Sequence, residues 1–126
     1  GRTSQALCKA AAYAAKEIRT EKIAVFTESG LMARRLSNVR SGLQSFALTT
    51  SQDACNQLAL IWGVTPHLHE DRGTTGEMLT VGEQTLLETG AVNVGETIIM
   101  MAGRLSGFGL SSSVIVWTVG AHLAER

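Results

Sequence analysis

The feature that most constrains the fold is the alternation of short apolar runs with segments of helical periodicity. Apolar runs rich in strand-forming residues lie at 22–26, 45–48, 64–69, 96–102 and 112–119. Helical patterns occupy 3–18, 31–39, 51–63 and 75–89. This alternation favours a mostly parallel sheet with helices on both faces. No helix fits between 102 and 112, and a parallel crossover needs about a dozen residues. We therefore expect a three-layer α/β/α fold with a mixed five-stranded sheet whose last strand is antiparallel.

Residues with special backbone preferences indicate where some of these elements end. Ser51 can cap a helix, because its hydroxyl can accept a bond from an N–H two or three residues further on. Gly63 is typical of the position just beyond a helix end. Pro66 suits an edge strand, since proline has no N–H to donate. The helix between Ser51 and Gly63 is expected to bury an apolar face formed by Ala54, Cys55, Leu58, Ala59 and Trp62.

The composition favours a single intracellular domain spanning residues 1–126. Charged residues make up only 17% of the chain and the net charge is zero, so nucleic-acid binding has no electrostatic support. No apolar stretch approaches the roughly 18 residues of a membrane helix, and the polar start, 1–5, lacks a signal-peptide pattern. The low charge content also indicates that another chain or domain covers part of the surface. We expect a cytoplasmic protein.

The two cysteines, Cys8 and Cys55, fall on the apolar faces of two helical segments. They lack the close C-x-x-C spacing of a redox pair, and nothing in the sequence indicates secretion. We therefore expect two buried free thiols in a reducing compartment.

The strongest candidate site is the turn Thr27-Glu28-Ser29-Gly30, where a strand meets a helix. The first N–H groups of a helix have no partner within the helix, and the helix dipole favours an anion beside them. Thr27 and Ser29 add hydroxyl groups, and Gly30 lets a phosphate approach the backbone. An ordinary strand-to-helix turn capped by Ser29 explains the same residues. The lysine and the spacing of a Walker A loop are absent.

A second candidate is the glycine-rich loop 103–109, which follows a strand. Open α/β sheets bind ligands at the carboxyl ends of their strands, and three glycines in seven residues give this loop conformational freedom. No G-x-G-x-x-G motif opens a helix here, so a dinucleotide site is not indicated. A flexible hairpin connection is the alternative explanation.

Other kinds of chemistry find little support in the sequence. His67 and His69 share one face of a strand, and Glu70 follows them. Zinc usually needs three or four ligands, and no further ligand accompanies these residues, so we expect no metal site. No serine–histidine–aspartate set and no carboxylate pair is singled out for catalysis. His122, in the tail, is expected to be solvated. We expect no catalytic centre in this chain.

Three stretches together resemble the C-terminal domain of pyruvate kinases. They are LCKAAAYAAKEIRTEKIAVFTESG (7–30), QLALIWGVTP (57–66) and MAGRLSGFGLSSSVIVWTVG (101–120). The resemblance implies the same α/β/α fold, with an antiparallel last strand. It also implies a regulatory domain with no cofactor of its own. In that family a separate barrel domain, which needs Mg²⁺ and K⁺, transfers phosphate from phosphoenolpyruvate to ADP in glycolysis.

The resemblance further implies a site for a phosphorylated effector. In members activated by fructose 1,6-bisphosphate, a cation or small polar residue often replaces Glu28, and a hydroxyl residue replaces Met32. Two unit charges of like sign 4 Å apart repel by roughly 1 kcal/mol in water and roughly 4 kcal/mol near a protein surface. We therefore expect a sugar or nucleoside monophosphate, or no effector, rather than a bisphosphate. The implied site residues are Thr27, Glu28, Ser29, Gly30, Leu31 and Met32 (these two through backbone N–H groups), Arg104, Ser106, Gly107 and Gly109.

The first helix and the last strand resemble the subunit interface of that family. The apolar residues of the first helix recur at helical spacing, and the last strand is apolar on both faces, which is unusual for an exposed edge. We expect contact with a twofold-related copy, giving a dimer here and a tetramer in the parent enzyme. Two alternatives are a free-standing small-molecule-binding module and a structural oligomerisation domain with a vestigial effector loop. The expected interface residues are Leu7, Ala11, Ala14, Ile115 and Trp117.

Overall fold

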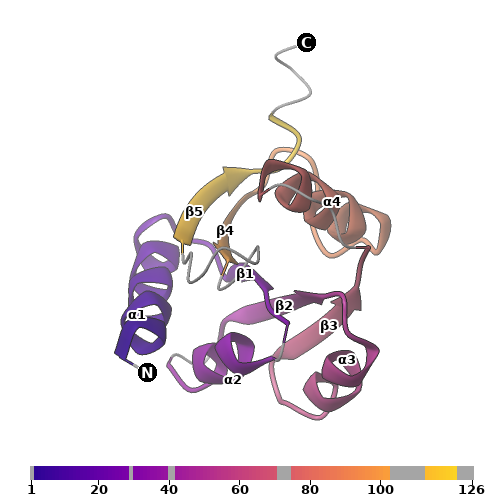
Figure 1. Ribbon diagram of the computed structural model, residues 1–126. Helices are drawn as coiled ribbons and strands as arrows, with labels where there is room; N and C mark the ends of the chain where they lie inside the picture. Colours follow the sequence, from indigo (N-terminus) through magenta and orange to yellow (C-terminus); the bar gives the residue numbers. More distant parts are fainter. Residues whose placement is uncertain (1, 29, 40–41, 71–74, 103–112, 122–126) are drawn as a thin grey trace.

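The computed structural model describes residues 2–28, 30–39, 42–70, 75–102 and 113–121 (Figure 1). Its helices are α1 (Arg2–Glu17), α2 (Leu31–Ser37), α3 (Gln52–Leu58) and α4 (Thr75–Glu88). Its strands are β1 (Lys22–Phe26), β2 (Gln44–Thr49), β3 (Val64–Leu68), β4 (Thr97–Ala102) and β5 (Ser113–Thr118). The predicted alternation is confirmed, and only the end of α3 departs by more than two residues. Among the described helices, none has both the length and the apolar character that crossing a bilayer requires.

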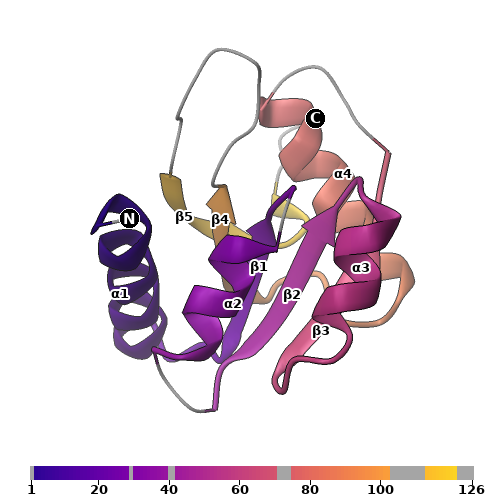
Figure 2. The same cartoon turned by 60° about the horizontal axis from the view of Figure 1, so that its bottom comes forward.

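The five strands form one sheet in the order β3-β2-β1-β4-β5. The central strand β1 pairs in parallel with β2 and β4, and β2 pairs in parallel with β3. The last strand, β5, runs antiparallel to β4, with Ile115 opposite Met100. Helices α1, α2 and α3 cover one face of the sheet and α4 covers the other (Figure 1 and Figure 2). The predicted three-layer α/β/α fold with an antiparallel last strand is confirmed.

The buried stripe of α1 is displaced by about one position from the predicted one. Leu7 and Ala14 lie half-buried at its margin, and Ile18 follows the helix end with 38% of its surface exposed. Because alanines occupy several consecutive positions of α1, more than one face is small and apolar, and the sequence pattern alone does not distinguish them. The residues of α1 that are buried in the first core are Cys8, Ala11, Ala12 and Ala15.

The second core lies between the sheet and α4. Its closest approach is at Gly82 of α4, where a Cβ atom would lie 2.4 Å from Cζ of Phe26 and 3.1 Å from Cδ1 of Leu48. The absence of a side chain at Gly82 therefore sets how near the helix comes to the sheet. The buried side chains of this core include Phe26, Phe46, Leu48, Met78, Leu79, Leu86, Ile98 and Met100.

Two local predictions are confirmed by the surroundings of α3 and β3, and a third is wrong. The Ser51 hydroxyl accepts a hydrogen bond from the Ala54 amide at 3.2 Å and so caps α3. Gly63 does not end α3 as expected, because the helix stops at Leu58; it lies in the turn before β3, with φ of 80°. Pro66 lies in β3, which is an edge strand. Both cysteines are buried free thiols, as expected.

The predicted apolar face of α3 is wrong at its end. The helix stops at Leu58, and the chain then turns, with the Ile61 amide donating to the Leu58 carbonyl at 3.0 Å. Helical spacing no longer applies beyond this turn, so Ile61 packs against the first core in place of Trp62. Ala59 and Trp62 are exposed, and Trp62 exposes 95% of its surface.

Candidate functional site

The carboxyl ends of the four parallel strands meet at one edge of the sheet, called here the carboxyl edge. The strands β1 and β4 are neighbours at this edge, with Phe26 paired to Ala102. The two candidate segments predicted from the sequence therefore begin at adjacent strand ends, which is the arrangement that a shared ligand site needs. The remaining predicted members of that site lie outside the described residues: Ser29, Arg104, Ser106, Gly107 and Gly109.

The turn after β1 is held by its own hydrogen bonds. The Thr27 hydroxyl accepts from the Gly30 amide at 2.9 Å, and the Gly30 carbonyl accepts from the Arg34 amide at 3.0 Å. Gly30 has a φ of 85°, and a Cβ atom at this position would lie 3.0–3.3 Å from the Leu58 side chain. Backbone conformation and core packing therefore account for glycine here. The Gly30 amide is one of the backbone N–H groups expected to bind an anion, but it already donates to the Thr27 hydroxyl.

The other described members of the predicted site differ in exposure. Glu28 is exposed, and Leu31 exposes 49% of its surface. Met32 is buried, with its sulfur 3.5 Å from the Cys8 sulfur, so its side chain belongs to the first core. Its expected contribution to the effector site is its backbone N–H, which stays a prediction. Burial raises the pKa of the Cys8 thiol, partly offset by the positive charge of Arg35. Cys8 is therefore a packing residue in its neutral form.

The structure adds polar residues to the carboxyl edge that the sequence analysis did not single out. The hydroxyl of Thr49, at the end of β2, accepts from the Ser51 amide at 3.1 Å, and the Thr49 carbonyl accepts from the His69 amide at 2.9 Å. The imidazole Nδ1 of His69 lies 2.9 Å from the Glu70 carbonyl oxygen. Because a carbonyl only accepts, Nδ1 carries the proton. The run Thr49-Thr50-Ser51, directly after a strand, was the available sequence clue.

His67, in β3, and His69, just after it, each pack against an aromatic ring of the second core. His69 packs edge-on against Phe26, with ring centroids 5.8 Å apart, and His67 lies 6.1 Å from the Phe46 ring. Burial lowers the pKa of His67, and its Nε2 atom has no hydrogen-bond partner within the described parts of the chain. Across those parts, no three histidine, cysteine, aspartate or glutamate side chains cluster as metal ligands do. His122 lies outside them.

The expected interface residues fall into two groups. Leu7 and Ala14 lie at the surface margin of α1, whereas Ala11 is fully buried inside the domain and has no surface to offer a second copy. Ile115 and Trp117 of β5 are half-buried and pack against the second core, on the side of α4. The sequence showed that β5 is apolar on both faces but not which face α4 covers.

On the opposite side of β5, Val114 packs against the first core, whereas Val116 exposes 57% of its surface. β5 pairs with β4 along one edge, and no described strand pairs with its other edge. Among the described residues of β5, the most exposed surface is therefore this strand edge together with Val116, and the roles of Ile115 and Trp117 in an interface stay predictions.

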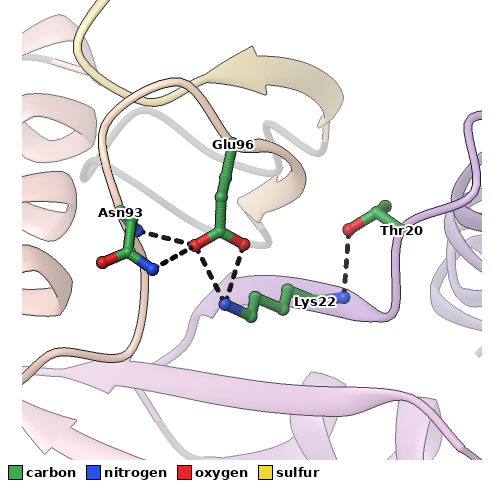
Figure 3. Close-up of polar contacts among 4 residues, drawn as sticks. All are labelled: Thr20, Lys22, Asn93 and Glu96. Carbon is green, nitrogen blue, oxygen red and sulfur yellow. Dashed lines mark hydrogen bonds and ion pairs between the residues drawn. The ribbon is translucent and has the colours of Figure 1, made fainter.

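A polar cluster holds the other end of the sheet, where β1 and β4 begin (Figure 3). The Lys22 ammonium lies 2.8 Å and 3.0 Å from the two oxygens of the Glu96 carboxylate. Asn93 donates to the same carboxylate from its backbone amide at 2.7 Å and its side-chain amide at 3.0 Å. The hydrogen bonds from Lys22, and then those from Asn93, lower the pKa of Glu96. This cluster ties the turn before β4 to β1 and has a structural role.

An open groove of about 640 Å³ lies at the same end of the molecule, beside Trp62. Among the described residues that line it, none carries a charge. The lining residues are Ser37, Asn38, Val39, Gly42, Leu43, Gln44, Ser45, Trp62 and Gly63.

Comparisons with known proteins identify the family. Residues 5–116 match the family model described as "Pyruvate kinase, alpha/beta domain". A pyruvate kinase of Staphylococcus epidermidis is 35% identical over 115 residues, and one of Staphylococcus aureus is 32% identical over 115 residues. In each case the match covers 90% of this chain but only 20% of the relative.

A solved structure of Cryptosporidium parvum pyruvate kinase in complex with ADP has the same fold. It superposes with a TM-score of 0.78 at 19% identity, over 92% of this chain and 23% of the other. The chain thus spans about a fifth of the length of the relatives that it matches. The sequence match over most of the chain and the shared sheet topology lead to one conclusion: the chain belongs to the pyruvate kinase alpha/beta domain family.

Proposed function

We propose that the chain is the regulatory and self-association domain of a pyruvate kinase, a glycolytic enzyme of the cytoplasm. The longer enzyme would transfer phosphate from phosphoenolpyruvate to ADP. Family membership supports this activity, and the relatives are long enough to contain a catalytic domain in addition to the part matched here. We assign the Mg²⁺ and K⁺ of the reaction to that other domain. Self-association is the function that the geometry of this chain supports best.

The observation that carries the self-association proposal is the open edge of β5. The strand reads SVIVWT and contains neither a charged residue nor a proline. Proteins usually protect an exposed edge with such residues, because unpaired N–H and C=O groups recruit other strands. An antiparallel pairing of β5 with β5 of a second copy would continue the sheet through a twofold axis. In the parent enzyme the same contact would contribute to a tetramer.

The other edge of the sheet provides a contrast. β3 carries Pro66 in its middle, which removes one N–H from the edge. It also exposes an apolar side chain, Leu68, to 50%, similar to the exposure of Val116. Exposed apolar surface alone therefore does not distinguish the two edges, whereas proline does. On the α1 side of β5, the half-buried Leu7 and Ala14 add apolar surface to the proposed interface.

The matched pair Val116→Lys and Leu68→Lys tests this proposal by sedimentation equilibrium. Both variants place a charge at a half-exposed position of an edge strand, so both should fold. We expect the unmodified chain to dimerise, Leu68→Lys to retain its affinity, and Val116→Lys to weaken it at least tenfold, or about 1.4 kcal/mol. A monomeric unmodified chain, or equal affinities for the two variants, refutes the proposed interface.

We also propose that the carboxyl edge binds a phosphorylated effector, with a sugar or nucleoside monophosphate favoured over a bisphosphate. The adjacent ends of β1 and β4 and the hydroxyls of Thr27, Thr49 and Ser51 support this role. Glu28 is exposed in the same turn, and its negative charge disfavours a second phosphate nearby.

A thermal-shift panel of phosphorylated metabolites tests the effector proposal. A ligand present at 100 times its dissociation constant stabilises the fold by about 2.7 kcal/mol. We expect stabilisation by one of the monophosphates, and stronger binding of fructose 1,6-bisphosphate by Glu28→Gln than by the unmodified chain. Tight binding of the bisphosphate by the unmodified chain would contradict the charge argument. If no ligand stabilises the chain, the remaining alternative is a structural oligomerisation domain with a vestigial effector loop.

A free-standing binding module is the second alternative to a piece of a pyruvate kinase. The length of the natural open reading frame separates the two. A frame several times longer than this chain, containing the catalytic domain, supports the enzyme; a frame of this chain's size refutes it.

A further inference from the structure

A buried carboxylate on α4 is the starting point. Glu83 is only 3% exposed, although it lies among the apolar residues of the second core. Its Oε1 atom accepts two hydrogen bonds, one from the indole Nε1 of Trp117 at 3.1 Å and one from the Gly120 amide at 2.5 Å. Burying a carboxylate is costly unless it is well hydrogen-bonded. A leucine or methionine would fill this site without the cost of burying a charge, so the role of the carboxylate is to hold its two donor groups in place.

Both donors belong to the end of β5. Trp117 is in the strand, and Gly120 follows it in a left-handed conformation with φ of 81°. The same chain end is also held from the turn before β4: the Val119 amide donates to the Glu96 carbonyl at 2.8 Å, and Val119 accepts from the Gly95 amide at 2.9 Å. Glu83 thus hydrogen-bonds this end to the helical layer, in addition to the packing of Trp117 and Val119 in the second core, and the turn at 93–96 hydrogen-bonds it to the sheet.

We propose that Glu83 is a positioning residue for self-association. β5 is the outermost strand and is hydrogen-bonded to the sheet along one side only. By fixing Trp117 and Gly120 from α4, the carboxylate sets the twist of β5 and holds its open edge in the plane of the sheet. Only an edge held in that plane can pair with a second copy along its length. This inference rests on the proposed self-association at β5.

Two substitutions of Glu83 separate positioning from folding. Glu83→Gln keeps an oxygen that can accept both N–H groups, because both bonds go to the same atom. Glu83→Met has a similar length but no acceptor. Glu88→Met, on the exposed face of the same helix, is the matched control. Trp117→Phe removes one donor and keeps an aromatic ring in the core.

The affinity of self-association, measured by sedimentation equilibrium, is the main readout. We expect Glu83→Met to fold, as judged by circular dichroism, but to weaken association at least tenfold, with a smaller loss for Trp117→Phe. Glu83→Gln and Glu88→Met should stay within about threefold of the unmodified chain. A folded Glu83→Met that associates as tightly as the unmodified chain overturns the proposal. If Glu83→Met does not fold, Trp117→Phe decides by the same criterion.

Hydrogen exchange tests the anchoring of β5 by Glu83 separately from self-association. If the unmodified chain is monomeric, self-association is refuted, and with it the role of Glu83 in that process. The anchoring of β5 is still measurable: the Gly120 amide and the Trp117 indole N–H should exchange faster in Glu83→Met and remain protected in Glu83→Gln. Unchanged protection in Glu83→Met overturns the anchor itself.

Discussion

The close contact between α4 and the sheet predicts that Gly82→Ala destabilises the fold, although alanine favours helices. In a helix interior, alanine is more favourable than glycine by about 1 kcal/mol. Against this gain, the new Cβ would lie 2.4 Å from Cζ and 2.8 Å from Cε1 of Phe26, well inside the 3.4 Å at which ordinary contact begins. Phe26 is 2% exposed and Leu48 is fully buried, so neither side chain can move aside without disturbing its neighbours.

Overpacking of a core costs about 1–3 kcal/mol, and a contact this short belongs at the upper end of that range. We therefore expect a net loss of about 1–2 kcal/mol for Gly82→Ala. Gly76→Ala, in the same helix, is the control, because no atom of the described residues lies within 4 Å of its added Cβ. It should be neutral or gain up to about 1 kcal/mol. Urea unfolding followed by circular dichroism measures both changes. A Gly82→Ala variant as stable as the unmodified chain refutes this reasoning.

Three further predictions concern single side chains. Burial lowers the pKa of His67, so the unfolded chain binds the proton more readily. Stability should therefore fall as the pH drops below about 6.5, and His67→Gln should flatten this part of a stability–pH curve; an unchanged slope contradicts the assignment. The pKa of Glu96 is lowered by Lys22 and Asn93, so its contribution is present above its ordinary pKa and is lost as the pH falls through the lowered value. Because the ion pair is partly exposed, Glu96→Gln should cost less than about 1 kcal/mol at neutral pH, and a cost well above that at high salt would oppose this view. Ser51→Ala removes the cap of α3 and should cost about 1 kcal/mol in urea unfolding. Ser37→Ala, at the C-terminal end of α2, serves as its control.

The architecture could be predicted because its determinants are local. Short apolar runs rich in strand-forming residues indicate the strands, helical spacing indicates the helices, and the short connection after Ala102 favours an antiparallel β5. Pro66 marked its strand as an edge because a missing N–H is a property of one residue. The position of the turn after β1 could also be predicted locally, because the strand pattern ends there and the helical pattern begins.

The parts that could not be predicted depend on contacts between distant segments. Trp62 is exposed because α3 ends early and the turn presents Ile61 to the core instead. The side chain of Met32 packs against Cys8 of another helix, a contact between distant segments that the local pattern does not show. Glu83 reads as one more polar residue of a helix, and only the arrival of β5 gives its carboxylate two donors. Which face a helix covers is decided by such partners and leaves no mark in the local pattern.

The central position of β1 has a consequence for the order in which the chain folds. β1, β2 and β3 are successive along the chain, and β4 with β5 form a second unit of near neighbours, whereas β1 joins β4 across more than half of the chain. Closing so long a loop costs more entropy than closing the shorter ones. We expect substitutions at Ile23 and Ile99, which pair along this seam, to speed unfolding more than they slow refolding. The two halves of the sheet would then take shape first, and the seam between them would close last.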